Sequence, residues 1–154
     1  MRYYGFTNMY LSSIQVGIQN AHCLVDMSRK YHDSYHGIDS DKRNDYTEWA
    51  DNHKTMMCLN GGNQKDLNQL AWHFSNSHNQ YAWEMFFEDN DSLNDCLTCV
   101  GIILPEHIYE AARLVRERIY VIDQLPQAPE FFNCNFSEWD LELINVLNNY
   151  RLAN

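Results

Sequence analysis

The segment Leu97–Pro105 (LTCVGIILP) decides the fold class, because an unbroken apolar run ends at a proline. A short continuous apolar run is typical of a strand that is buried on both faces of a sheet. Proline is tolerated at the first position of a helix, so Pro105 predicts that a helix follows this strand directly. The residues that we expect on the inward face of that helix are Ile108, Ala111, Ala112 and Val115.

Upstream of this segment, apolar and aromatic runs predict three further strands. They are Tyr3–Phe6, Thr55–Leu59 and Tyr81–Phe87. Helical patterns separate the first three strands of the chain. The inward stripe expected for the first helix, which runs to about Tyr31, consists of Ile14, Ile18, Ala21 and Val25. The stripe expected for the second helix consists of Leu67, Leu70, Ala71 and Phe74. This order of elements predicts an α/β fold, with a small mixed β-sheet flanked by helices.

Local capping signals predict where several helices begin. Ser12 or Ser13 is expected to cap the first helix and Asn63 the second, while Asp45 is expected to cap a short helix with Tyr46 and Trp49. Residues 124–135 contain two prolines and break the periodicity. Ser137 and Asp140 then have the spacing of a capping box and open a last helix. We therefore expect an α/β domain over residues 1–123, and a linker with a C-terminal helical extension over residues 124–154.

Composition excludes several classes of protein. The 154 residues are 45% hydrophobic and 21% charged, which is the balance of a globular domain. No apolar run approaches the roughly 18 residues of a membrane span, and the N-terminus lacks the order of a signal peptide. The odd number of cysteines, five, favours reduced thiols and a cytoplasmic location. The net charge of −10 disfavours nucleic acid as a partner, whereas backbone N–H groups can still hold a small anion.

Two expected helix starts are the candidate anion sites. Ser12 and Ser13 open the first helix, and Gly61, Gly62 and Asn63 join a strand to the second. Glycines allow a ligand close to the backbone, and a helix N-terminus offers free N–H donors. The alternative is a plain cap at the first start and a tight turn at the second. The glycine segment lacks the lysine of a P-loop, so ATP hydrolysis of that type is not indicated.

Other polar residues admit both a chemical and a structural interpretation. His22 either points into a site beside the sheet or is a core histidine bound to a carbonyl oxygen. The acidic residues between two strands, which are Glu88, Asp89, Asp91 and Asp95, either hold a cation or supply a general base, or form a solvated loop. Cys96 and Cys99 are expected to point to opposite faces of the sheet, and no second Cys-x-x-Cys pair follows, which disfavours zinc. His32 and His36 lie in an expected loop with no placed acidic partner. We expect neither a metal ion nor a cofactor.

The segment Tyr10–His22 resembles the opening helix of class II peptidyl-tRNA hydrolases, with Gly17, Ile18 and His22 at the positions of that family's pattern. The likeness extends over about residues 3–115. It implies a hydrolase-like fold and, for an enzyme, a loop aspartate at Asp91 or Asp89 and a strand threonine at Thr98. The lysines that meet tRNA phosphates in the family are replaced here by Gln15 and Gly17. This departure and the acidic charge disfavour tRNA.

The opening helix and the Asn60–Asn63 turn are also similar to those of small proteins encoded by tailed bacteriophages. This resemblance implies an anti-defence protein of the host cytoplasm that binds and sequesters a nucleotide second messenger, cyclic or derived from ADP-ribose. The ligand contacts that we expect are Ser12, Ser13, Gln19, His22, Gly61, Gly62 and Asn63. We also expect a homodimer or a higher homo-oligomer.

Two alternatives to sequestration remain open. In the first, the protein is a peptidyl-tRNA hydrolase that cleaves the ester of peptidyl-tRNA. In that enzyme Asp91 would orient water, His22 would position the ester and Thr98 would support the oxyanion. In the second, the protein inhibits a host factor by binding it through an acidic and aromatic surface, which predicts an apolar patch on the C-terminal helix.

Overall fold

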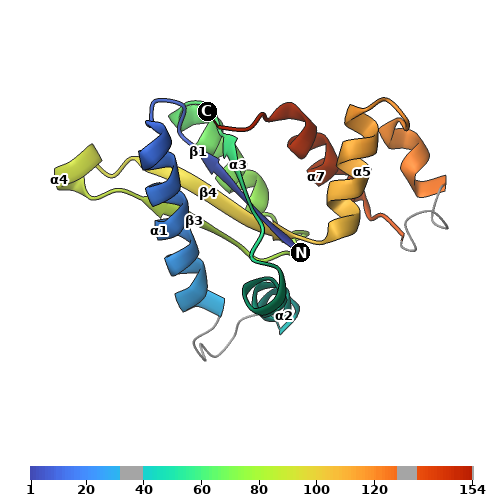
Figure 1. Cartoon of the computed structure of the whole chain (residues 1–154), viewed down its shortest axis with the longest axis horizontal. Coiled ribbons are helices and arrows are strands. Elements are labelled where there is room, and N and C mark those ends of the chain that lie inside the picture. The colour runs from blue at the N-terminus through green and yellow to red at the C-terminus, as the bar shows by residue number, and fades with distance from the viewer. Residues whose placement is uncertain (32–39, 128–134, 154) are drawn as a thin grey trace. The chain divides into compact units, whose positions relative to one another are not determined.

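A computed structural model describes residues 1–31, 40–127 and 135–153 of the chain (Figure 1). The first part of the chain comprises β1 (Arg2–Thr7), α1 (Ser13–Tyr31), α2 (Ser40–Glu48), a π-helical turn η1 (Trp49–His53), β2 (Met56–Asn60), α3 (Gln64–Phe74), β3 (Trp83–Phe87), α4 (Asn90–Leu93) and β4 (Leu97–Leu104). The remainder comprises α5 (Glu106–Arg116), a 3-10 helix η2 (Ile122–Gln127) and α7 (Glu138–Asn149).

The four strands form one mixed sheet in the order β2-β1-β4-β3, which confirms the expected fold class. β1 and β2 are parallel, and β4 is antiparallel to both β1 and β3. β3 therefore runs in the same direction as β1 and β2, and the carboxyl ends of these three strands meet at one edge of the sheet. We call this edge the carboxyl edge. It includes the loops that adjoin these strand ends, which are residues 8–12, 61–63 and 88–96.

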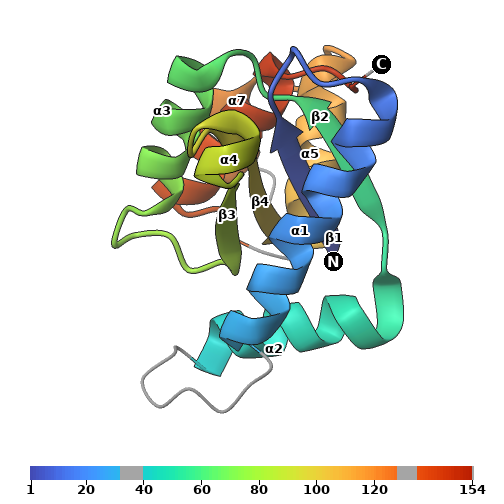
Figure 2. The same cartoon turned by 90° about the vertical axis from the view of Figure 1, so that its left-hand side faces the viewer.

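Helices α1 and α3 cover opposite faces of the sheet (Figure 2). On one face Asn20 of α1 accepts a hydrogen bond from the Cys99 thiol of β4, with 3.7 Å between Sγ and Oδ1. On the other face Phe74 of α3 packs against Phe6 of β1, with ring centroids 5.9 Å apart. The sheet-facing side of α3 is the expected one, because Leu67, Leu70, Ala71 and Phe74 are all buried.

The expected inward stripe of α1 is wrong. Ile14 is 76% exposed, Ile18 45% and Val25 57%, and Ala21 is also exposed. The residues of α1 that are buried instead are Val16, Gln19, Asn20, Cys23, Met27 and Tyr31.

The reason for this error is that α1 carries two stripes with the same periodicity. Val16, Asn20, Cys23 and Met27 repeat the spacing of four, three and four found in Ile14, Ile18, Ala21 and Val25, shifted by two residues. Gly5 of β1 explains why the stripe that contains Asn20 faces the sheet. A Cβ at this glycine would overlap the Asn20 side chain, so the missing Cβ gives Asn20 its place on the sheet.

Several other expectations are confirmed or corrected. Asn63 and Ser137 form capping boxes with Asp66 and Asp140. Asp45 does not cap a helix, because α2 already extends from Ser40 and encloses it. On α5 the buried residues are Ile108, Ala111, Ala112 and Leu114, whereas Val115, which was expected to point inward, is half-buried.

The described chain divides into two compact units. The first contains residues 1–104 and 152–154, and the second contains residues 105–151, so α5 groups with α7. The boundary expected from the sequence, after residue 123, lies within the second of these units. In the first unit Leu152 forms an antiparallel bridge with Leu59 at the free edge of β2. No helix within the described ranges combines the length and the apolar character needed to cross a membrane.

Candidate functional site

Backbone hydrogen bonds join the loops of the carboxyl edge. Asn8 N donates to the carbonyl oxygen of Thr98 at 3.1 Å, and Met9 N donates to that of Gly62 at 2.8 Å. Gly61 N donates to the carbonyl oxygen of Thr7 at 2.7 Å. The segments that carry the expected ligand contacts therefore lie side by side, although they come from distant parts of the chain. In open α/β sheets, ligands bind outside the carboxyl ends of the strands.

The start of α1 is exposed and carries no carboxylate. Ser12 N and Ser12 Oγ both donate to Gln15 Oε1 at 2.9 Å, and Gln15 N donates back to Ser12 Oγ at 3.4 Å. This is a capping box in which the reciprocal group is a neutral amide. The first turn of α1 has no acidic residue, so the positive end of the helix dipole is not compensated within the helix.

The start of α3 differs because an acidic side chain already occupies it. Asn63 N donates to Asp66 Oδ2 at 2.9 Å, while Lys65 N and Asp66 N donate to Asn63 Oδ1. Gly62 has φ of 82°, a left-handed conformation that favours glycine, and its missing Cβ leaves the space that the Asp66 carboxylate fills. An anion bound at this start would have to displace that carboxylate.

A chain of buried polar groups connects α1 with the strands. Thr98 Oγ1 donates to Gln19 Oε1 at 2.7 Å, and Gln19 Nε2 donates to Glu88 Oε1 at 2.6 Å. Gln19 and Thr98 are almost fully buried, whereas Glu88 is half-buried. The pairing of β3 with β4 shifts between Phe86 and Phe87, which leaves Thr98 as an extra residue. Such a bulge explains why Thr98 and its neighbour Cys99 both reach α1.

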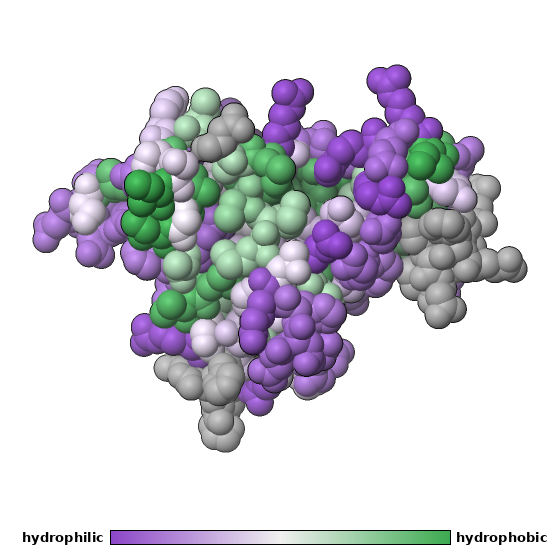
Figure 3. Space-filling model, viewed as in Figure 1, coloured by the Kyte–Doolittle hydropathy of each residue, from purple (hydrophilic) through white to green (hydrophobic). Residues whose placement is uncertain are grey.

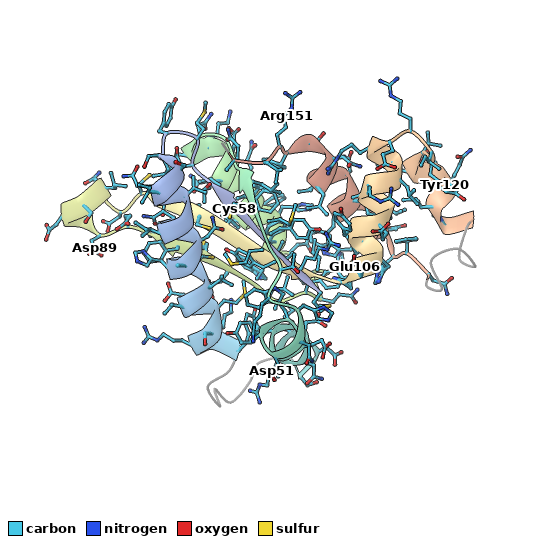
Figure 4. The ribbon with its side chains drawn as sticks, viewed as in Figure 1. Asp51, Cys58, Asp89, Glu106, Tyr120 and Arg151 are labelled. Carbon is cyan, nitrogen blue, oxygen red and sulfur yellow. The ribbon has the colours of Figure 1, made fainter. Side chains whose placement is uncertain are left out.

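The other expected catalytic residues lie apart from this chain of hydrogen bonds. His22 is exposed and packs on Phe86 of β3, with ring centroids 4.7 Å apart. Asp91 lies in the short exposed helix α4, and Asp89 precedes it (Figure 4). Among the described residues, no hydrogen bond or ion pair joins either aspartate to His22 or Thr98. The carboxylate that contacts the expected site residues is Glu88.

The Cys99 thiol below the polar chain is not an activated nucleophile. Burial raises the pKa of the Cys99 thiol well above its usual value, and burial also raises that of the Tyr3 phenol beside it. A nucleophilic cysteine requires a lowered pKa. The Cys96 thiol contacts Gln64 of α3, whereas the Cys99 thiol contacts Asn20 of α1. The two cysteines therefore point to opposite faces, as expected.

The charge of the carboxyl edge is negative. Its carboxylates are Glu88, Asp89, Asp91 and Asp95, and the adjoining first turn of α3 adds Lys65 and Asp66. Within the described ranges, His, Cys, Asp and Glu form no group of three or more that could hold a metal ion. His32 and His36 lie outside the described residues.

Sequence reasoning did not find the contact between Gln19 and Glu88. The two residues are 69 positions apart, and no local motif pairs them. The sequence places Glu88 in an acidic cluster and Gln19 among the expected ligand contacts, but only the fold brings their side chains together. Comparison of the chain with models of protein families, curated proteins and solved structures finds no match.

Proposed function

We propose that the protein binds a nucleotide second messenger, cyclic or derived from ADP-ribose, at the carboxyl edge and sequesters it. The observation that carries this proposal is the start of α1. It combines exposed serines, a positive helix end and the absence of an acidic residue in the first turn. Backbone N–H groups and serine hydroxyls at a helix N-terminus are suitable ligands for phosphate oxygens. The start of α3 is less suitable because Asp66 occupies it.

An exposed aromatic ring supports a nucleotide over a simple anion. Tyr10 is 80% exposed and lies two residues before the cap of α1. An aromatic ring next to a phosphate site can stack on a base, which contributes about 1–3 kcal/mol per base in proteins that bind single strands. The acidic residues of the carboxyl edge disfavour a long polyanion more than a small ligand with one or two phosphates.

Binding without cleavage is supported by the positions of two residues expected to act in a hydrolase. His22 packs on Phe86, and the buried Thr98 hydroxyl donates to Gln19. The biological role that we propose, withholding a signal from a host effector, derives from the similarity of Ser12–His22 and of the Asn60–Asn63 turn to small bacteriophage proteins. We also propose that the fold derives from that of class II peptidyl-tRNA hydrolases, which the chain resembles.

The test places a carboxylate at each helix start in turn. Ser13→Glu introduces a negative charge at the start of α1, and Lys65→Glu introduces one at the start of α3. Isothermal titration calorimetry with ADP-ribose, cyclic ADP-ribose and a cyclic dinucleotide measures affinity. We expect one of these probes to bind the wild type. We expect Ser13→Glu to weaken it about tenfold or more, a loss of roughly 1.4 kcal/mol. Lys65→Glu should change affinity much less.

Two results would contradict the proposal. The first is that none of the three nucleotides binds or raises the melting temperature of the wild type. The second is that Lys65→Glu weakens binding while Ser13→Glu does not. Recovery of the nucleotide unchanged after heating the complex distinguishes sequestration from hydrolysis, since a hydrolase would release products.

A second candidate function is cleavage of the ester of peptidyl-tRNA. The observation that favours it is the half-buried Glu88 carboxylate, which accepts a hydrogen bond from Gln19, while Gln19 in turn accepts one from the buried Thr98 hydroxyl. Glu88, in place of Asp91, would orient the water in this enzyme. Turnover of peptidyl-tRNA by the wild type, lost in Glu88→Gln and retained in Asp91→Asn, would support it. The acidic carboxyl edge makes it the weaker candidate.

A further inference from the structure

Exposed apolar side chains gather on the outer face of α1, where Figure 3 shows green patches beside white and purple ones. Ile14, Ile18 and Val25 are large exposed side chains, and Ala21 is exposed between them. We call these four residues the α1 seam. In contrast, none of the large exposed apolar side chains of the described residues lies on α7, where a protein-binding inhibitor was expected to carry its patch.

The spacing of the α1 seam is that of a coiled coil. Its members follow one another at intervals of four, three and four residues, which is the alternation of the a and d positions in a heptad repeat. Ile18 and Val25 take the a positions, and Ile14 and Ala21 take the d positions. Gly17, beside the seam, has no atom within 4 Å of where a Cβ would be. Small residues at Gly17 and Ala21 allow another helix to approach closely.

We propose that the α1 seam pairs with the α1 seam of a second copy of this chain, in antiparallel orientation. A two-fold axis between residues 19 and 20 places Ile14 opposite Val25 of the other copy, and Ile18 opposite Ala21. Each layer then combines an a with a d position, and each includes one of the isoleucines. The seam contains no charged residue, so pairing buries apolar surface without burying a charge.

The charges beside the α1 seam match a second copy in this orientation. The flank of α1 that carries His22 faces β3, since His22 packs on Phe86. The acidic loop that follows β3 adjoins the N-terminal half of α1 through the contact of Gln19 with Glu88. Arg29, seven residues after His22, lies on the same flank at the C-terminal end of α1 and is exposed.

The antiparallel orientation brings opposite charges together. It places Arg29 of each copy near the acidic loop of the other. A parallel pair would gather both acidic loops at one end and both arginines at the other, where like charges repel. The same surface thus carries both Arg29 and the acidic loop that Arg29 of the other copy approaches. Such self-complementarity is the property of an isologous interface.

The proposed dimer is weak. A helix of 19 residues is about 28 Å long. One face of such a helix buries less than the ~800 Å² per partner of a standard stable interface. The equilibrium is therefore expected to shift with protein concentration in the micromolar range.

Sedimentation velocity over a concentration series of the full chain tests the pairing. We expect the wild type to shift from monomer towards dimer as the concentration rises to several hundred micromolar. Ile18→Glu and Val25→Glu should remain monomeric at every concentration. Trp72→Glu is the matched control, because Trp72 is an exposed apolar side chain on α3 and 76% exposed. This variant should dimerise like the wild type.

The outcomes that would overturn the proposal are distinct. A wild type that stays monomeric throughout excludes a second copy and leaves another protein as the occupant of the α1 seam. Dimerisation lost in Trp72→Glu but kept in Ile18→Glu assigns the interface to α3. Circular dichroism of each variant shows that monomeric behaviour is not due to unfolding. No ligand is needed, so the result is independent of the proposed function.

Disulfide trapping tests the orientation. The double variant Ile14→Cys/Val25→Cys should form covalent dimers under mild oxidation, because the two positions face each other in the antiparallel pair. Ile14→Cys alone should form no more than the wild type, whose own cysteines set the background. Efficient trapping of the single variant would indicate a parallel pair and overturn the proposed orientation.

Discussion

Helices α1 and α3 start at the same edge of the sheet and cover opposite faces, but they meet the sheet with different chemistry. α3 packs apolar side chains such as Leu67 and Phe74 on it. α1 places Gln19, Asn20 and Cys23 there and leaves its isoleucines outside. The buried polar groups of α1 are bonded, for example Asn20 Nδ2 to the carbonyl oxygen of Val16 at 2.8 Å. The comparison teaches that α3 mainly stabilises the sheet. α1 instead buries polar side chains against the sheet and exposes apolar side chains on its outer face, and neither feature is needed for packing alone.

The starts of the two helices differ in the same sense. α3 begins with a closed capping box whose acidic member compensates the helix dipole. α1 begins with neutral side chains and stays open to an anion. A stable protein could have used an acidic cap at both starts. The difference is therefore the feature on which we base the proposed ligand site.

The largest expected effect is a cavity under α3. Leu67→Ala removes a fully buried side chain and should lower the free energy of unfolding by about 3 kcal/mol. Ile18→Ala on the exposed face of α1 should change it by no more than about 0.5 kcal/mol. Urea denaturation at a concentration where the protein is monomeric compares the two. Equal losses would mean that the α1 seam is buried within the monomer.

A somewhat smaller effect is expected where α1 approaches the sheet. Gly5→Ala places a Cβ against the Asn20 side chain and should cost about 1–3 kcal/mol through overpacking. Asn20→Ala makes space, so the double variant should be more stable than the sum of the two single losses predicts. A double-mutant cycle by thermal or urea unfolding measures this coupling. Strict additivity would show that Gly5 does not position α1.

The two helix caps should differ in a modest way. Asn63→Ala removes the acceptor of two backbone N–H groups and should cost about 1 kcal/mol. Ser12→Ala removes an acceptor with a single longer contact of 3.4 Å and should cost less. Urea denaturation of the two variants ranks the two caps. A larger loss of stability for Ser12→Ala than for Asn63→Ala would contradict our inference that α3 is the helix that mainly stabilises the sheet.

The smallest energetic effect concerns the thiol between α1 and the sheet. Burial raises the pKa of Cys99, so its thiolate fraction at pH 8 is lower than that of a free cysteine. Because the folded state disfavours the thiolate, alkylation of Cys99 should be slow in the native protein and rapid in urea. Mass spectrometry of peptides after treatment with iodoacetamide follows this reaction. Fast native labelling at Cys99 would show that α1 readily separates from the sheet.

Much of the fold was predictable because its signals are local. The apolar run of Leu97–Leu104 and the caps at Asn63 and Ser137 act within a few residues, and each appears where expected. The candidate site was predictable only as a set of segments. The pattern predicts Ser12, Gly62 and Thr98 only as separate contacts, and the fold brings their segments to one edge of the sheet. The polar contacts of Gln19 likewise depend on Glu88, far away in the sequence.

The chain's own pattern established that residues 13–31 form a helix with apolar residues at intervals of four, three and four. It did not establish which of two such stripes meets the sheet, because periodicity is the same for both. The tertiary structure decided this through Gly5, whose missing Cβ leaves space for Asn20. A helix-forming pattern is a local property of the backbone, whereas the choice of its buried face depends on the shape and hydrogen-bonding groups of the surface that receives it.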